Sequence, residues 1–450
     1  MRKMIGMLVV TVITSLYFFP IEFTFLPGIN TKMMLAALGL VILGLRMSRR
    51  GDATIDKDFS TLSLWALGVS LAGFAAVVYN NTYDYMYATY IISMWVWCGG
   101  AYTVVSLIRA LHGKASVVLV GNYLVAVCVM QCILAMIISS SPSFEQLINR
   151  YVAGLGFVDL NTLKETKRLY GIGASLDVAG TRFAAVLTLI AYMMTHIDLE
   201  KNKWALWSYV AAIFIIGAIG NMISRTTTIG VLVCLAYLVY EVLFRMRDEA
   251  SRKKLISIFA GGTVLGLGIS VFLYQTNAEV RENFRFAFEG FFSLAETGRW
   301  DVHSNEILKN MFVLPDSFKT WVIGDGYMDN PYYSDPYYIG PKWGGFYKAT
   351  DIGYLRFIFY FGVVGLGIFC GYFIKLGQIL MNRFKQEHLI FLILISLNFV
   401  FWLKVSTDIF VFYALFLMIG EQENDDYNQV CLRSEQVECT QNLTPYGKGG

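Results

Sequence analysis

The residue best suited to chemistry is Arg225, which lies in the stretch Gly220-Asn-Met-Ile-Ser-Arg-Thr-Thr-Thr228 between two apolar segments. An ionisable group at the edge of a membrane is costly unless it is paired, functional or extended to the water interface. The hydroxyl residues around Arg225 would let a helix N-terminus and a guanidinium face the same anion. The stretch therefore predicts a catalytic, phosphate-binding arginine, with an ordinary interfacial arginine as the alternative.

A second group of cations lies in the loop 139–181. The loop contains Lys164, Lys167 and Arg168, and Arg182 stands where the next apolar segment begins. The topology derived below puts this loop outside the membrane, where an excess of Lys and Arg runs against the usual preference. An anionic ligand on that side would explain the excess, so we expect Arg168 and Arg182 to bind substrate. A solvated basic loop is the alternative.

The longest polar interruption, residues 275–350, lies between two apolar segments and must face water, because its charges would find no partners in hydrocarbon. It carries Arg299 beside Trp300 and, further on, Asp325 and Tyr327. A guanidinium next to an aromatic ring suits sugars and phosphates, and sugars stack on aromatic faces. We expect Arg299 to be catalytic and the other three residues to contact substrate. The many tyrosines of the loop could equally form an interfacial belt.

Asp351 directly precedes the apolar segment that follows this loop. A carboxylate there caps a helix N-terminus, which is the default interpretation. The functional alternative is a general base that deprotonates an acceptor hydroxyl, a role that Asp301 and His303 share more weakly. The sequence has no signature of a metal site, phosphate-binding loop, dinucleotide site or catalytic triad, so we predict neither a metal nor a cofactor.

The composition places these residues in a membrane protein. Of 450 residues, 56% are hydrophobic and only 15% are charged, which is far more apolar than a soluble domain requires. The net charge of +3 comes from short basic clusters and predicts no nucleic-acid partner. The seven cysteines lie in apolar runs or in the tail, so no disulfide framework is predicted.

Hydropathy predicts an all-α integral membrane protein with about twelve transmembrane helices and a large periplasmic loop between the ninth and tenth. The second, sixth, eleventh and twelfth segments are short for a span. The predicted organisation is spans one to nine within residues 1–274, the loop 275–350, spans ten to twelve within 351–420 and a polar tail at 421–450. The twelve predicted spans are Met4–Phe23, Met33–Leu45, Leu62–Val78, Ala88–Ile108, Val117–Ile138, Phe183–Met194, Trp204–Ile219, Thr227–Phe244, Leu255–Tyr274, Ile352–Phe373, Leu389–Leu403 and Val405–Ile419.

Basic residues fall in every second loop, which predicts the orientation. By the positive-inside rule the loops that hold them are cytoplasmic, and so are both termini. The loops 139–181 and 275–350 and the turn at Arg225 then lie on the other side, which is periplasmic in a Gram-negative bacterium. The basic residues used are Arg2, Lys3, Arg46, Arg49, Arg50, Lys57, Arg109, Lys114, Lys201, Lys203, Arg245, Arg247, Arg252, Lys253, Lys254, Lys375, Arg383 and Lys385.

Several stretches, in this order and sidedness, resemble the O-antigen polymerase and O-antigen ligase superfamily of bacterial inner-membrane proteins. The turn around Arg225 is similar to the family's Ser-x-Ser-Arg-Thr segment, and Arg168-Leu-Tyr-Gly171 to its Arg-x-x-Gly element. Gly298-Arg299-Trp300 through Gly324-Asp325-Gly326 resembles its periplasmic Gly-Arg and Gly-x-Gly region. Asp351-Ile-Gly-Tyr-Leu through Phe361-Gly-Val-Val-Gly365 resembles its closing segment.

The resemblance implies a polymerase of surface polysaccharide, O-antigen or capsule, that joins undecaprenyl-pyrophosphate-linked oligosaccharides at the periplasmic face of the inner membrane without a metal. Arg225, Arg168 and Arg182 would then hold pyrophosphate, Arg299 pyrophosphate or sugar, and Asp351 the acceptor hydroxyl. Ligases of the family carry a histidine where this chain has Thr350-Asp351, which favours a polymerase over a ligase. The ligase is the first alternative and a flippase or other transporter the second, and a separate chain-length regulator is a possible partner.

Overall fold

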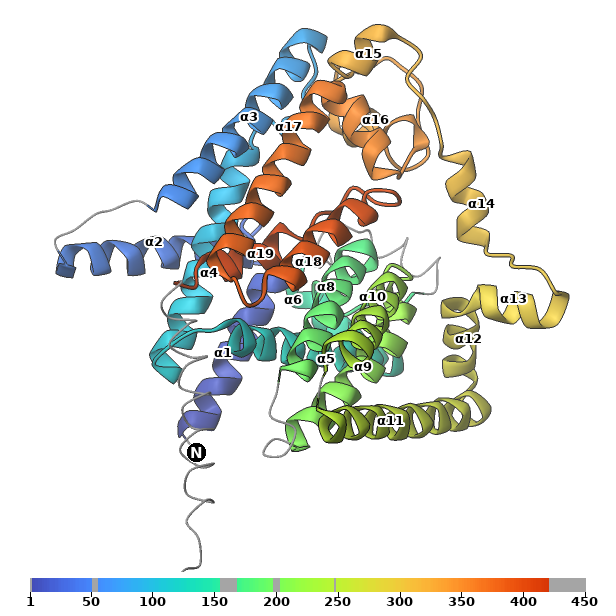
Figure 1. Ribbon diagram of the computed structural model, residues 1–450. Helices are drawn as coiled ribbons and strands as arrows, with labels where there is room; N and C mark the ends of the chain where they lie inside the picture. Colours follow the sequence, from blue (N-terminus) through green and yellow to red (C-terminus); the bar gives the residue numbers. More distant parts are fainter. Residues whose placement is uncertain (1, 51–55, 154–167, 197–202, 247, 421–450) are drawn as a thin grey trace, which may run out of the picture.

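In the computed structural model the chain is built from α-helices (Figure 1). The structure describes residues 2–50, 56–153, 168–196, 203–246 and 248–420. Within these ranges there is no β-strand, and two isolated bridges join Glu22 to Asn30 and Phe23 to Val152. Lys164, Lys167 and the tail 421–450, which entered the sequence predictions, lie outside the described residues.

The α-helices are α1 Arg2–Phe18, α2 Thr31–Arg50, α3 Lys57–Asn80, α4 Tyr90–His112, α5 Val117–Ser140, α6 Pro142–Tyr151, α8 Leu176–Thr195, α9 Lys203–Ile223, α10 Thr227–Tyr240, α11 Glu249–Thr276, α12 Ala278–Ala287, α13 Glu289–Thr297, α14 His303–Asn310, α15 Phe318–Val322, α16 Pro331–Ser334, α17 Gly353–Arg383, α18 His388–Phe401 and α19 Phe410–Leu417.

Each predicted span overlaps a helix, with bounds that differ. In the described part of the chain, nine helices are long and apolar enough to cross a membrane, namely α2 to α5, α8, α9, α10 with the π-helical turn that continues it, α11 and α17. The second and sixth predicted spans were drawn too short, because α2 and α8 are each 20 residues long. The helices α1, α18 and α19 have 17, 14 and 8 residues and are not among the nine.

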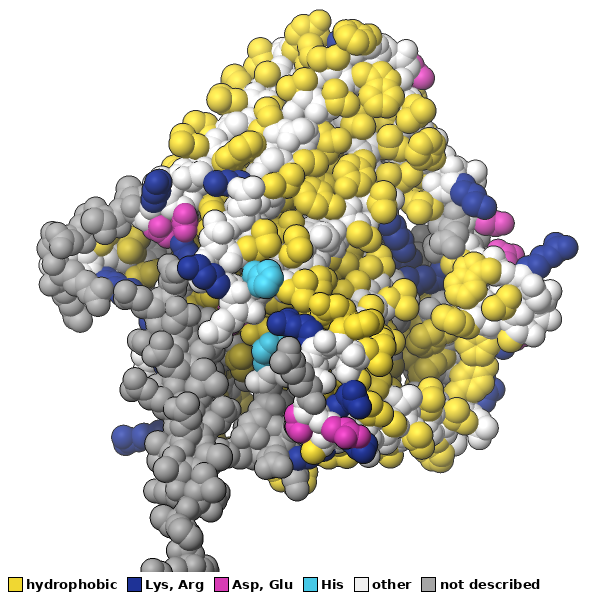
Figure 2. Space-filling view, viewed as in Figure 1, with side chains coloured by type: hydrophobic (Ala, Val, Ile, Leu, Met, Phe, Trp, Pro, Cys, Tyr) yellow, Lys and Arg dark blue, Asp and Glu magenta, His cyan; other side chains and the backbone are white. Residues whose placement is uncertain are grey.

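The helix α8 is the centre of the bundle. Every residue of α8 from Ala179 to Met194 is buried, because the surrounding helices cover this stretch. At the other extreme, α2 and α11 expose most of their apolar side chains. Figure 2 shows hydrophobic side chains spread over the face of the molecule that is in view. An apolar exterior of this kind suits contact with lipid, since hydrocarbon is as apolar as these side chains.

Small residues bring α8 and α10 together. A side chain at Gly230 of α10 would collide with Ala184 of α8, and one at Gly180 would collide with Ser224 and Thr226. Such contacts let two helix backbones approach closely. The turn that carries Arg225 is therefore held against the first turns of α8.

The helix α17 is a hairpin rather than one straight helix. Gly362 at its apex has a φ of 66°, a left-handed conformation that glycine adopts without strain. In a straight helix Phe357 and Phe369 would be about 18 Å apart, yet their ring centroids are 5.2 Å apart. The segment predicted at 352–373 as a single span therefore reverses direction within its length. A first limb, residues 353–361, leads from the core to the apex, and a second limb, 363–383, returns beside α3 (Figure 1).

The two long polar loops contain helices of their own. Residues 275–350 form α12 to α16, and Figure 1 shows α12 to α14 standing away from the helical body. We call α12 and α13, residues 278–297, the outer arm. The loop predicted at 139–181 contains α6, and α8 already begins at Leu176. Part of the predicted loop is therefore the first turn of the central helix.

Candidate functional site

The candidate site is a cluster of charged residues from segments far apart in the sequence. Asp177 lies in the first turn of α8, Arg225 precedes α10 and Asp351 precedes α17. Arg168 and Lys404 come from the segments before α8 and before α19, and each lies close enough to Arg225, Asp177 and Asp351 for their charges to act on it. Figure 2 shows Lys and Arg side chains in the recess between the helical body and the α12–α14 region. The predicted outer ends of the helices thus meet at one place.

Arg225 is fixed by its own turn and by the outer arm. The turn is closed by hydrogen bonds from the amide of Ser224 to the carbonyl of Gly220 (2.7 Å) and from the hydroxyl of Thr228 to Asn221 Oδ1 (2.5 Å). The threonine hydroxyls therefore serve the fold of the turn. The guanidinium is 13% exposed and bonds to the outer arm, so it lies at the mouth of the site.

Arg168 lies on the same side of the cluster as Arg225. Both guanidinium groups contact the ring of Phe286, with centroid distances of 5.4 Å and 4.3 Å. The Nε of Arg168 is buried and has no hydrogen-bond partner in the described part of the chain. Burial and then the nearby charge of Arg225 lower the pKa of Arg168, while the two aspartates of the cluster oppose this. Two crowded, partly desolvated guanidinium groups are chemically suited to bind an anion.

The turn 402–408, which precedes α19, joins α17 to α8. A side chain at Gly353 would collide with the carbonyl groups of Trp402 and Val405, and the amide of Tyr354 donates to the Trp402 carbonyl (3.1 Å). On its other side, the hydroxyl of Thr407 donates to Asp177 Oδ2. This close packing sets Lys404 beside the first residues of α17.

Asp351 lies among charges of both signs. Burial, followed by the negative charge of Asp177, raises the pKa of Asp351 to about 7, against the opposing charges of Arg356, Lys404 and Arg168. Burial and the charges of Arg168 and Arg225 lower the pKa of Lys404. A carboxyl group that titrates near neutral pH beside an anion site can accept a proton from a bound hydroxyl.

Arg356 is a member of this neighbourhood to which the sequence assigned no role. It is 6% exposed and donates from Nη1 to Ser406 Oγ (2.6 Å) and from Nη2 to the Met328 carbonyl (3.0 Å). Its Nη1 is 3.8 Å from Asp351 Oδ1. Arg356 thereby ties the long loop and the turn 402–408 to the first limb of α17. Its place within an apolar run was the available signal, because a charge at such a depth requires a partner.

Arg182, predicted to bind substrate, lies behind the cluster. It is buried among the rings of Phe18, Phe19 and Trp97, and its Nη1 donates to the Phe18 carbonyl. It therefore supports the site from the core and presents no surface to it.

Arg299 and Trp300 follow the last turn of the outer arm, and the Trp300 ring lies back against Gly290 in the first turn of α13. Trp300 packs edge-on against Phe291 (5.1 Å between centroids), and the backbone carbonyl of Arg299 accepts a hydrogen bond from Ser293. Among the described residues no contact joins the Arg299 side chain to Arg225 or Asp351. The structure leaves these two residues apart from the cluster.

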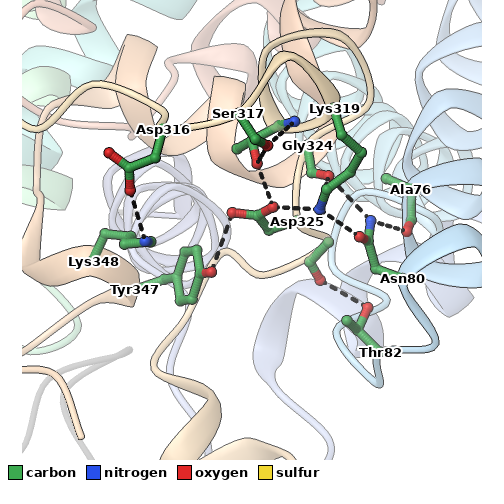
Figure 3. Close-up of polar contacts among 12 residues, drawn as sticks. Ala76, Asn80, Thr82, Asp316, Ser317, Lys319, Gly324, Asp325, Tyr347 and Lys348 are labelled. Carbon is green, nitrogen blue, oxygen red and sulfur yellow. Dashed lines mark hydrogen bonds and ion pairs between the residues drawn. The ribbon is translucent and has the colours of Figure 1, made fainter. Parts of the chain in front are cut away.

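Asp325 and Tyr327 hold the long loop together, and Figure 3 shows the contacts of Asp325. Asp325 accepts hydrogen bonds at Oδ1 from Lys319 Nζ (2.6 Å) and Thr320 (2.7 Å), and at Oδ2 from Tyr347 (3.2 Å). Lys319 also donates to Asn80 Oδ1 at the end of α3 (2.8 Å). The hydroxyl of Tyr327 donates to Asp335 (2.7 Å). These contacts give both residues a structural role.

The opposite end of the bundle gathers residues predicted to be cytoplasmic. Arg383 Nη2 is 2.8 Å from Asp56 Oδ2 and 2.9 Å from Asp58 Oδ2, and Arg109 donates to the Met418 carbonyl. Within the described ranges, no group of three His, Cys, Asp or Glu residues is arranged to hold a metal ion.

Comparisons of the chain with known protein families, with curated proteins and with solved structures found no match. The chemistry of the cluster is therefore the basis for assigning a function. It offers several cations to an anion and, next to them, one carboxyl group able to take a proton.

Proposed function

We propose that the chain is a polysaccharide polymerase that joins undecaprenyl-pyrophosphate-linked oligosaccharide units at the outer face of a bacterial inner membrane. The observation that carries the proposal is that Arg168 and Arg225 share the Phe286 ring, while Arg168 and Lys404 lie close enough to Asp351 for their charges to act on it. The four charged residues come from four segments that the sequence predicts on one side of the membrane. The family resemblance adds the substrate class.

In the proposed reaction the cations hold the diphosphate of the donor. The acceptor hydroxyl oxygen attacks the first sugar carbon of the growing glycan and forms the new glycosidic bond, and its proton passes to Asp351. The bond from that carbon to the diphosphate oxygen breaks, and the electron pair leaves with the diphosphate. Fixed guanidinium groups stabilise the charge that develops on this leaving group, as other preorganised donors do.

The proposed orientation follows from the two ends of the bundle. The cluster would face the periplasm, while the end with Arg383, Asp56 and Asp58 and both termini would face the cytoplasm. A donor lipid in the outer leaflet would then present its diphosphate at the depth of the cluster.

The decisive experiment is the length distribution of surface and lipid-linked glycan in a strain that lacks the gene. For a polymerase we expect single repeat units, either on the surface or on the lipid, and long chains after complementation. Long chains that accumulate on undecaprenyl pyrophosphate would indicate a ligase instead. Single units trapped on the cytoplasmic face would indicate a flippase. Unchanged glycan would refute all three functions.

A further inference from the structure

The outer arm places an anion of its own in the candidate site. Arg225 Nη2 donates to Glu289 Oε2 (2.6 Å) and to the carbonyl of Phe286 (2.9 Å). The Phe286 ring also contacts Arg168 and Arg225. A carboxylate and a carbonyl thus stand where the proposed function would put oxygens of a phosphate.

Glu289 lies where an incoming anion could displace it from Arg225. The Glu289 side chain is 33% exposed, whereas the Arg225 side chain is 13% exposed, so the carboxylate approaches the site from its open side. A ligand anion coming from water would meet Glu289 before it reached Arg225.

The outer arm has a second contact that does not involve the site. Arg285 of α12 pairs with Glu296 of α13 (2.6 Å) and lies over the Phe292 ring (5.1 Å). Glu296 is thus a carboxylate of α13 whose arginine partner is not a residue of the candidate site.

We propose that Glu289 is a specificity-determining residue that makes the site select a diphosphate over a singly charged anion. The inference rests on the proposed function, because it takes Arg225 and Arg168 to be the anion site. A monoanion would only replace the Glu289 carboxylate on Arg225 with a group of similar charge, so its net binding free energy would be small. A diphosphate can contact Arg168, Arg225 and Lys404 together, which compensates for the loss of the Glu289 contact.

The test uses the purified full-length protein in detergent, titrated with inorganic pyrophosphate and with dimethyl phosphate, a monoanion. Glu289→Gln retains the shape of the side chain and removes the competing charge. We expect the Kd for pyrophosphate to fall about tenfold and the preference for pyrophosphate over dimethyl phosphate to shrink. The matched control is Glu296→Gln, a carboxylate on the same helix paired with Arg285, which should leave both affinities unchanged.

If Glu289→Gln bound pyrophosphate no more tightly than the unsubstituted protein, the inference would be overturned. The absence of pyrophosphate binding in every variant would overturn it as well. A parallel titration of Arg225→Gln separates this from the proposed function. Loss of binding in Arg225→Gln with no effect of Glu289→Gln keeps the anion site and rejects the competing role of Glu289. Unchanged binding in Arg225→Gln rejects the anion site itself.

Discussion

Arg168 and Arg225 share one aromatic ring, since both guanidinium groups lie within 5.4 Å of the Phe286 centroid. We predict that alanine at either position lowers the polymerisation rate about a hundredfold or more, the usual effect of removing one preorganised donor to a developing anion. The rate is measured as incorporation of lipid-linked units by purified protein. Arg285→Ala, which removes an exposed arginine of the outer arm, is the control and should retain most activity. Normal glycan length at normal protein levels in Arg225→Ala would rule out its role.

The general base should give the reaction its pH dependence. Only the ionised carboxylate of Asp351 accepts a proton, and its pKa is raised to about 7 by burial and by Asp177. Activity should therefore be low in acid, rise through about pH 7 and level off above it. Asp177→Asn removes a nearby negative charge, which lowers the pKa of Asp351 and moves the midpoint toward lower pH. A midpoint that stays in place in Asp177→Asn, or full activity in Asp351→Asn, would contradict the assignment.

Arg356 should matter for stability. Its buried guanidinium joins Ser406, the Met328 carbonyl and Asp329, so Arg356→Ala removes the connection between three segments. We expect a loss of about 3 kcal/mol, typical of breaking a buried charged contact, visible as a lower apparent Tm in detergent. Asp329→Asn is the comparison, because the Asp329 side chain is 57% exposed and should contribute less than about 1 kcal/mol. Equal effects of the two substitutions would show that burial of Arg356 is not the cause.

The contacts of Asp325 should keep the long loop attached to α3. Asp325→Ala removes the acceptor of Lys319, Thr320 and Tyr347, so we expect the loop to be cut several times faster by trypsin added to the outer side of spheroplasts. Asp316→Ala is the matched control, since Asp316 is 85% exposed and only pairs with Lys348 at 3.6 Å. Similar cleavage of the two variants would assign the order of the loop to other contacts.

Hydropathy predicted the helices well because apolar runs of this length form helices in lipid. It missed the hairpin of α17, since the apolar run at 352–373 continues through the apex and only Gly362 marks the reversal. Hydropathy reports whether a segment is apolar, whereas the direction of the chain depends on close packing at the apex, where Gly362 meets the backbone of Val322.

The charge pattern predicted that Arg168, Arg225 and Asp351 share a side of the membrane, and in the structure Arg168 lies near both Arg225 and Asp351. It could not separate the two arginines from Arg299, which has the same side chain and the same predicted side. The difference arises from the outer arm, because Glu289, the first residue of α13, reaches Arg225 while Arg299 follows the last turn of that helix. Lys404 and Arg356 were overlooked as site residues because only the tertiary packing of the turn 402–408 sets them beside Asp351.

The hairpin of α17 bears on how a lipid-linked substrate reaches Asp351. The first limb is about 14 Å long, so Asp351 lies well below the apex at Gly362 and the loop that covers it. A reactant attached to a lipid diffuses laterally within its leaflet and cannot pass over the apex of the hairpin. Under the proposed function, donor and acceptor would therefore arrive laterally, through the recess beside the outer arm, and the finished glycan alone would leave upward into water.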